Sequence, residues 1–282
     1  MAEYKLEDIP KIGFGTYKIK TQEEINNCLK YALQSGYRHI DTAQLYKNEH
    51  LISNFLENQM PELGIGCTRH DLWITTKVPY FTMLEGDEEK IRKSILQSCN
   101  YFGGYVDLYL IHASNPNDMK TWRILQEYQK SGHIRYIGLS NYNLERLNNF
   151  IERLGLNSGE HGIYMNQIEF NPFLNRADLV ASCQELGIRV TAYGSLYKKN
   201  ELIKRIVSNM NEMDNKSNSV EFTEEQILLA WSASKNIIVI PMSANPQHIE
   251  DNYKSMMIKL HEDDIARLNK LHENYTRYAK HL

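Results

Sequence analysis

Apolar and polar residues follow two repeating patterns along this chain: short, almost continuous apolar runs, and longer stretches with an apolar residue every three or four positions. The short runs predict buried strands, and the longer stretches predict amphipathic helices. We expect strands at residues 38–41, 72–77, 106–112, 136–140, 163–168, 189–193 and 237–241, after a first short strand in KIGFGTYK. We expect helices at residues 21–34, 49–58, 88–101, 119–131, 143–154, 176–186, 223–234 and 246–256.

The strands and helices alternate and make eight strand–helix units. Strands that are apolar along most of their length are typical of a parallel sheet covered by helices. Eight such units in 282 residues favour a (β/α)8 TIM barrel, an α/β fold, as a single domain over residues 1–282. The alternative is an open doubly wound sheet. That architecture normally has a glycine-rich phosphate-binding turn after its first strand, and KIGFGTYK does not complete the motif.

Two segments depart from this alternation. Residues 200–221 begin as a short amphipathic helix and continue as an asparagine-rich stretch, so we expect a polar, mobile flap beside the site at this position. Residues 262–271 have helical periodicity and predict an added helix on the outside of the barrel.

Polar side chains stand where three consecutive expected strands end. Asp41 closes one strand, Lys77 the next and His112 the one after, while Tyr46 lies in the loop just beyond Asp41. Taken singly, each has an ordinary structural explanation: a helix cap, a surface lysine, a hydrogen-bonded core histidine and a packed tyrosine. Together they indicate a site, because the carboxyl ends of barrel strands share one rim, where this fold carries its chemistry.

Composition narrows the class of protein. The net charge is −3 and 42% of the residues are hydrophobic, which argues against a nucleic-acid partner and for a large buried core. The first eleven residues contain no apolar signal region, and no apolar run is long enough to span a membrane, so we expect a protein of the cytoplasm or of an equivalent reducing space, without a membrane partner. We also expect a monomer. The four cysteines and ten histidines show no metal-ligand spacing, which predicts reduced thiols and no metal site.

Eight sequence strings resemble the aldo-keto reductase family, in the family's order and over essentially the whole chain. They are GFGTY, GYRHIDTAQLYKNE, LWITTK, DLYLIH, IGLSNY, NQIEFNP, GIRVTAYGSL and IPMSANPQHIEDN. The resemblance implies an NAD(P)H-dependent oxidoreductase on a TIM barrel, which reduces small aldehydes or ketones to alcohols.

The resemblance also implies a role for each of the four rim residues, and the chemistry of carbonyl reduction supports the same roles. Hydride transfer to a carbonyl carbon leaves negative charge on the oxygen, which a well-placed acid must neutralise. Tyr46 is expected to donate that proton, and Lys77 to lower the pKa of the phenol. Asp41 would keep Lys77 charged and in place, and His112 would orient the carbonyl group.

Contacts with the cofactor follow from the resemblance as well. Ser140, Asn141 and Gln167 are expected to hold the nicotinamide carboxamide, and Tyr193 to stack on the nicotinamide ring. A helix cap explains Asn141 and Gln167 equally well, and Tyr193 could simply fill the core. The resemblance implies further nucleotide contacts at Leu196, Ser243, Asp251 and Asn252.

The family pattern is broken where the adenosine 2′-phosphate of NADPH is usually held. Met242 and His248 are still expected to face the cofactor, but they replace a lysine and an arginine, so two cations are missing. We therefore expect use of both NADP and NAD, with NADH favoured relative to the family's habit. Lys198 and Lys199 stand where the family usually has glycine or serine. They are either solvated lysines or a partial replacement that meets the pyrophosphate.

The substrate pocket is the part that the sequence determines least. Tyr17, Tyr80 and Phe81 are candidates for an aromatic wall or are ordinary packing residues, and Ala113 follows the expected catalytic histidine. Two other functions remain open beside catalysis. The same barrel could bind a nicotinamide nucleotide as a redox-sensing module with little turnover, or it could be an inactive structural protein.

Overall fold

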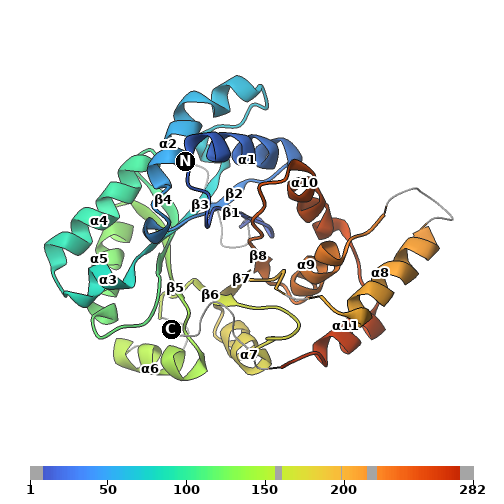
Figure 1. Ribbon diagram of the computed structural model, residues 1–282. Coiled ribbons are helices and arrows are strands. Elements are labelled where there is room, and N and C mark those ends of the chain that lie inside the picture. The colour runs from blue at the N-terminus through green and yellow to red at the C-terminus, as the bar shows by residue number, and fades with distance from the viewer. Residues whose placement is uncertain (1–8, 156–160, 198, 215–220, 274–282) are drawn as a thin grey trace.

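The computed structural model describes residues 9–155, 161–197, 199–214 and 221–273. In this part of the chain, eight parallel strands pair in sequence order from β1 to β8. The sheet closes where the segment around β1 meets β8: Gly13 N donates to Val239 O at 2.8 Å, and Gly15 N donates to Pro241 O at 3.0 Å. The predicted single-domain (β/α)8 barrel is confirmed, and its helices form a ring around the strands (Figure 1).

The strands are β1 (Phe14–Gly15), β2 (His39–Asp41), β3 (Trp73–Val78), β4 (Val106–Ile111), β5 (Ile134–Ser140), β6 (Met165–Glu169), β7 (Arg189–Tyr193) and β8 (Ile238–Val239). The helices that alternate with them are α1 (Gln22–Ser35), α2 (Glu49–Asn58), α4 (Glu88–Tyr101), α5 (Asp118–Lys130), α6 (Leu144–Leu154), α7 (Ala177–Glu185), α9 (Glu224–Ser234) and α10 (Pro246–Lys254). Additional helices are α3 (Tyr80–Leu84), α8 (Glu201–Asp214) and α11 (Glu262–Asn269). Short 3-10 turns cover Gln44–Tyr46, Met60–Leu63, Arg69–Asp71 and Ser255–Met257.

The connection from α1 to β2 brings Asp41 to the rim of the barrel. Thr21 caps the start of α1 by accepting a hydrogen bond from Glu24 N at 3.2 Å, and the Glu24 carboxylate accepts one from Thr21 N at 3.1 Å. Gly36 ends the helix with a φ of 109°, and a Cβ atom there would lie 2.6 Å from the Tyr253 hydroxyl. Glycine at this position lets the chain turn directly into β2.

The hydrophobic core has two parts. The larger part fills the space between the strands and the helices, and the smaller part lies inside the barrel. Alternation along the strands separates them, because successive side chains point to opposite faces. In β3, Lys77 points into the barrel towards Asp41, whereas Thr76 points outwards towards α2. The inner cluster contains Ile9, Trp73, Leu108, Leu110, Met165 and Ile238.

The expected flap at residues 200–221 is wrong for most of its length. α8 occupies Glu201–Asp214 and lies against α9 and α11 on the outside of the ring (Figure 1). It buries Ile203 and Ile206 almost completely. Two isoleucines three positions apart lie on one face of a helix, which is enough to anchor an otherwise polar segment. Residues 215–220 lie outside the described residues.

Other differences from the expected elements are small. β4 ends at Ile111, so His112 lies one residue beyond the strand that it was expected to close. The short helix α3 was not expected, and it carries Tyr80 and Phe81. α11 covers Glu262–Asn269, within the range expected for an added helix, and it buries Leu268. Within the described ranges, none of the helices combines the length and apolar character needed to traverse a lipid bilayer.

Candidate active site

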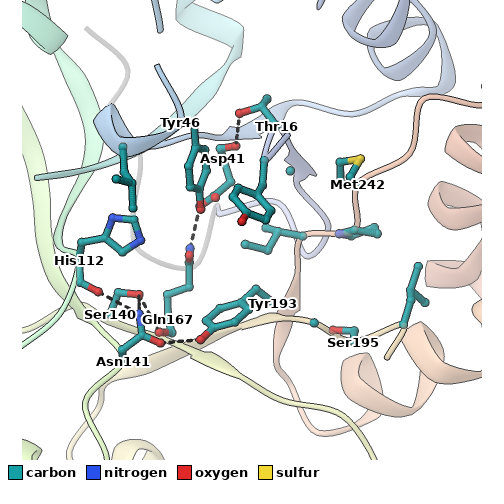
Figure 2. Close-up of a pocket in the computed structure, with 17 residues that line it drawn as sticks. Thr16, Asp41, Tyr46, His112, Ser140, Asn141, Gln167, Tyr193, Ser195 and Met242 are labelled. Carbon is teal, nitrogen blue, oxygen red and sulfur yellow. Dashed lines mark hydrogen bonds between the residues drawn. The ribbon is translucent and has the colours of Figure 1, made fainter. Parts of the chain in front are cut away.

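A cavity of about 340 Å³ opens at the carboxyl ends of the strands. Figure 2 shows side chains from several strands and their following loops turned towards this cavity. Chain segments that are far apart in sequence meet here because a closed parallel barrel brings all its strand ends to one rim. The residues singled out in the sequence that line the cavity are Tyr17, Asp41, Tyr46, His112, Ser140, Asn141, Gln167, Tyr193, Leu196 and Met242.

Lys77 lies behind the cavity wall, where it pairs with Asp41. Its ammonium donates to Asp41 Oδ1 at 2.7 Å and to Thr42 O at 2.8 Å, and both charged side chains are almost fully buried. Burial raises the pKa of Asp41 and lowers the pKa of Lys77, and their ion pair opposes both shifts. Held by these two hydrogen bonds, the Lys77 ammonium has a fixed position behind the cavity wall.

Gln167 completes this cluster from β6, on another part of the barrel wall. Its Nε2 donates to Asp41 Oδ2 at 2.7 Å, so both carboxylate oxygens of Asp41 are hydrogen-bonded. No hydrogen bond among the described residues uses the Gln167 side-chain oxygen. That oxygen is therefore the part of Gln167 that can accept a hydrogen bond from a ligand.

Tyr46 stands at the end of the 3-10 turn that follows β2. Lys20 Nζ donates to its backbone oxygen at 2.7 Å and holds the turn, while no hydrogen bond among the described residues uses the phenol oxygen. The ammonium of Lys77 lies 5.2 Å from the centre of the Tyr46 ring.

The surroundings of Tyr46 affect the acidity of its phenol. Burial, and then the negative charge of Asp41, raise the pKa of the phenol well above its usual value. Lys77 directs its hydrogen bonds to Asp41 and Thr42 and makes none to the phenol. The phenol is thus held in its protonated form.

The imidazole of His112 lies beside Tyr46, with 6.1 Å between the ring centres and the rings nearly perpendicular. Burial, and then the positive charge of Lys77, lower the pKa of His112 to about 3. The ring is therefore neutral at physiological pH. Its Nδ1 is buried and has no hydrogen-bond partner among the described residues, and the ring lines the cavity beside Tyr46.

Asn141 organises the opposite wall of the cavity. Its amide donates to His112 O at 2.9 Å, and its side-chain oxygen accepts a 2.6 Å hydrogen bond from the Tyr193 hydroxyl. Its backbone is left-handed, with a φ of 63°, a conformation that asparagine tolerates better than most residues. Ser140 beside it donates to Gln167 O at 3.0 Å. These bonds fix the side chains expected to meet a nicotinamide carboxamide.

An unpaired hydroxyl in the cavity bears on whether the site fits a dinucleotide. Ser195 is only 4% exposed and lines the cavity, yet its Oγ has no hydrogen-bond partner among the described residues. A buried hydroxyl without a partner is costly unless a ligand or water satisfies it. With the free oxygen of Gln167 and the flanking ring of Tyr193, the site offers a donor, an acceptor and an aromatic face, which fit such a cofactor.

The residues expected at the adenosine end do not all reach this cavity. Met242 lines its rim and is 37% exposed, but four others do not line it. Asn245, the N-terminal cap of α10, donates its backbone N–H to Ser243 Oγ at 3.1 Å. Ser243 thus belongs to the turn before α10, and the other three belong to the helix itself. The expected contacts outside the cavity are Ser243, His248, Asp251 and Asn252.

The two lysines after Tyr193 were expected to be either solvated or near the pyrophosphate. Lys199 does not line the cavity, and its ammonium pairs with Glu225 at 2.5 Å. The pair leaves Lys199 compensated, so the surface interpretation is the better one for this residue. Lys198 lies outside the described residues.

Of the residues expected in the substrate pocket, only Tyr17 lines the cavity. Tyr17 lines the cavity and packs against Tyr46 with 5.1 Å between ring centres. Tyr80 and Phe81 are 45% and 47% exposed on α3 and do not line it, and Ala113 is buried outside it. Leu45 does line it and was missed, although an exposed leucine beside Tyr46 in a polar turn was a usable signal.

The side-chain groupings in the described ranges also bear on whether the protein binds a metal ion. Among those residues, no group of three or more histidine, cysteine, aspartate or glutamate side chains could hold a metal ion. Cys28, Cys67, Cys99 and Cys183 are all free thiols and buried.

Known proteins similar to this chain share one family description. The sequence model of the Aldo/keto reductase family matches residues 11–273. An uncharacterized oxidoreductase, YtbE, of Bacillus subtilis (strain 168) is 32% identical over 273 residues, which are 95% of this chain and 90% of that protein. Methylglyoxal reductase DkgB of Escherichia coli O157:H7 is 33% identical over 265 residues, 91% of this chain and 90% of that protein.

A solved structure gives the same result for the fold. The aldose reductase from Schistosoma japonicum has a TM-score of 0.83 and 27% sequence identity, with 96% of this chain and 91% of that chain covered. This chain therefore belongs to the aldo/keto reductase family.

Proposed function

We propose that this protein reduces aldehydes and ketones to alcohols with NAD(P)H, with Tyr46 as the proton donor. One observation carries the proposal: the Asp41–Lys77 ion pair, the free phenol of Tyr46 and the neutral ring of His112 converge on one cavity. No packing requirement explains three such polar groups at one rim. The regulatory or structural alternatives have no specific observation in their favour.

The cavity offers suitable contacts for a nicotinamide nucleotide, which supplies the hydride when bound. Gln167 would accept a hydrogen bond from the carboxamide with its free side-chain oxygen, and Tyr193 would flank the ring. Asn141 and Ser140 would hold these two side chains in place through the hydrogen bonds already described. Ser195 would donate its unpaired hydroxyl to an oxygen of the nucleotide.

Proton transfer is the part of the reaction that this chain's own residues carry out. The raised pKa keeps the Tyr46 phenol protonated, so it can donate a proton to the oxygen of a carbonyl group in the cavity. Lys77 lies close enough to the ring to stabilise the phenolate that remains, and Asp41 holds Lys77 in position. Neutral His112 would hydrogen-bond the same carbonyl and orient it.

The nucleotide is proposed to be either NADH or NADPH, with NADH favoured relative to other members of the family. Met242 at the cavity rim carries no charge, and Lys199 is compensated by Glu225. The 2′-phosphate of NADPH carries a double negative charge and gains most from charge-assisted hydrogen bonds. Fewer free cations near the adenosine end reduce that gain.

Small carbonyl compounds are the proposed substrates. The Escherichia coli relative is named a methylglyoxal reductase, so 2-oxoaldehydes are the first compounds to test. A small cavity with an open apolar side formed by Tyr17 and Leu45 suits such molecules and would also accept simple aromatic aldehydes. We propose that the protein acts as a monomer.

A spectrophotometric panel tests the function directly. NADPH and NADH oxidation would be followed separately with methylglyoxal, an aromatic aldehyde and a simple ketone, and the Tyr46→Phe variant would be the matched control. We expect turnover by the wild-type protein that the variant lacks. Nucleotide binding without turnover of any carbonyl compound would overturn the proposal in favour of the regulatory module.

A further inference from the structure

A buried carboxylate outside the described mechanism lies on the other side of the barrel wall from Lys77. Glu49 is the first residue of α2 and is 6% exposed. Its Oε1 accepts a hydrogen bond from Thr76 Oγ1 at 2.6 Å, and its Oε2 accepts one from Ser98 Oγ at 3.1 Å. Thr76 directly precedes Lys77 in β3, so the carboxylate is tied to the strand that carries the lysine.

From Glu49, a chain of hydrogen bonds leads back to the turn that carries Tyr46. Ser98 Oγ accepts a hydrogen bond from the Tyr109 hydroxyl at 3.1 Å and another directly from Gln44 Nε2 at 2.8 Å. The Tyr109 hydroxyl in turn accepts one from Gln44 Nε2 at 2.9 Å. Gln44 is two residues before Tyr46 in the same 3-10 turn. The side chains of Ser98 and Tyr109 are fully buried, so water cannot replace these bonds.

The chain has a direction, because the Gln44 amide nitrogen at one end can only donate and the ionised Glu49 carboxylate at the other end can only accept. Gln44 donates to Tyr109 and to Ser98, Tyr109 donates to Ser98, and Ser98 donates to Glu49. Thr76 also donates to Glu49, so both carboxylate oxygens act as acceptors. A protonated carboxyl, or an amide in its place, would bring a hydrogen to one of these contacts and force a hydroxyl to turn round.

We propose that Glu49 is a positioning residue for carbonyl reduction: its ionised carboxylate fixes the direction of the hydroxyl chain that holds the Tyr46 turn, and supports the positive charge of Lys77. The proposal rests on the proposed reductase function. The physical basis is that oriented hydrogen bonds keep a catalytic group in its productive position for a larger fraction of the time. Small displacements of a catalytic group lower the reaction rate.

The electrostatics of the buried layer agree with this role. Burial raises the pKa of Glu49 to about 7, with the two hydroxyl donors and Lys77 opposing the rise. In turn, Glu49 raises the pKa of Lys77 and thus opposes the effect of burial on the lysine.

Two other titratable groups face Glu49, namely Tyr109 on β4 and Cys99 on α4. Burial raises the pKa of Cys99 to about 12 and the pKa of Tyr109 well above its usual value, so both remain protonated. Glu49 is therefore the group in this layer that changes charge near neutral pH.

The test is the kcat of wild-type protein, Glu49→Gln and Glu49→Asp as a function of pH, with KM and nucleotide Kd measured alongside. We expect Glu49→Gln to lower kcat by about tenfold above pH 8, with KM and Kd within about twofold of wild type. Below about pH 6 wild-type Glu49 is itself protonated, so the ratio of the two kcat values should fall towards one. Glu49→Asp keeps the charge and should recover part of the loss.

Controls separate charge from packing. Glu57→Gln removes an exposed carboxylate from the same helix and should leave kcat unchanged at every pH. Ser98→Ala removes the hydroxyl through which both Gln44 and Tyr109 connect to Glu49, so it should lower kcat with a loss that does not vanish below pH 6. It also provides a second test if Glu49→Gln does not fold.

The outcomes distinguish this inference from the proposed function. A Glu49→Gln loss that is the same at every pH, or an equal loss in Glu49→Asp, would overturn the inference, because volume alone would then explain it. A kcat of Glu49→Gln equal to that of the wild-type protein would also overturn the inference, and it would leave the proposed reductase function intact. A wild-type protein that reduces no carbonyl compound would overturn both.

Discussion

Asp41 and Lys77 form a 2.7 Å ion pair in which both side chains are almost completely removed from solvent. The pair joins the ends of β2 and β3, and Gln167 adds a further hydrogen bond from β6. Such a pair fixes the positions of its two side chains more than it stabilises the fold, because the free-energy cost of burying two charges is about as large as their attraction. Breaking it by removing one partner is different, since the other charge remains buried.

The ion pair predicts a non-additive effect on stability. Asp41→Asn leaves the Lys77 ammonium uncompensated and should lower the free energy of unfolding by about 3–5 kcal/mol. Adding Lys77→Met should restore much of that loss without restoring turnover. Urea unfolding of both variants, with kcat measured in parallel, checks this. A double variant no more stable than the single one would show that the buried charge is not the cause.

Tyr46→Phe should separate chemistry from binding. The ring and its packing against Tyr17 remain, but the proton donor is gone, so kcat should fall by about 10²–10⁴-fold. The phenol oxygen makes no hydrogen bond among the described residues, so folding and nucleotide affinity should change little. Kinetics with NADPH and NADH, and nucleotide titration by fluorescence, provide the measurement. Turnover equal to wild type would refute the role of Tyr46.

Two buried histidines predict how stability depends on pH. Burial, and then Lys77, lower the pKa of His39 and of His112 from 6.5 to about 3 in the folded protein. Below pH 6.5 the unfolded chain therefore binds protons that the folded chain does not. The free energy of unfolding should fall as the pH drops from 6.5 towards 3, by up to about 1.4 kcal/mol per pH unit for each histidine.

A variant isolates one of these two contributions. His39→Gln removes the titrating ring inside the barrel and leaves the cavity lining unchanged. The free energy of unfolding should therefore depend less steeply on pH between about pH 4 and 6, by the contribution of one bound proton. Urea unfolding at a series of pH values gives the slope. Parallel curves for variant and wild type would mean that His39 is not held neutral.

Restoring cations near the adenosine end should change the nucleotide preference. Met242→Lys together with His248→Arg should tighten NADPH binding by about tenfold or more, because each charge-assisted hydrogen bond contributes about 1.5–3 kcal/mol. NADH affinity should stay within about twofold, since NADH lacks the 2′-phosphate. Met257→Lys is the matched control: Met257 is 75% exposed and does not line the cavity. Equal tightening of both nucleotides would contradict the proposal.

Ser195→Ala tests the unpaired hydroxyl. Its Oγ makes no hydrogen bond among the described residues of the free protein, so the variant should be as stable as wild type or slightly more stable. Nucleotide affinity should fall by about threefold to tenfold, the value of one hydrogen bond. Thermal unfolding and nucleotide titration measure the two effects. Unchanged affinity would mean that Ser195 does not meet the cofactor.

Some of this protein was predictable from local sequence. The alternation of apolar strands and amphipathic helices predicted the barrel, because burial on both faces leaves a continuous apolar run. The order of units also predicted which residues reach the rim, since strand ends in a closed parallel barrel lie together. Asp41, Tyr46 and His112 were found in this way, and so was Lys77 behind them.

Long-range contacts decided the rest, because their energies depend on neighbours that no local pattern specifies. The bond from Gln167 to Asp41 spans 126 residues, and it determines which atom of Gln167 stays free. The pKa of Tyr46 rises because burial disfavours the phenolate and Asp41 adds a negative charge nearby, and both effects follow from the tertiary structure. Likewise, Glu49 became a candidate only when folding placed Thr76 and Ser98 around its carboxylate.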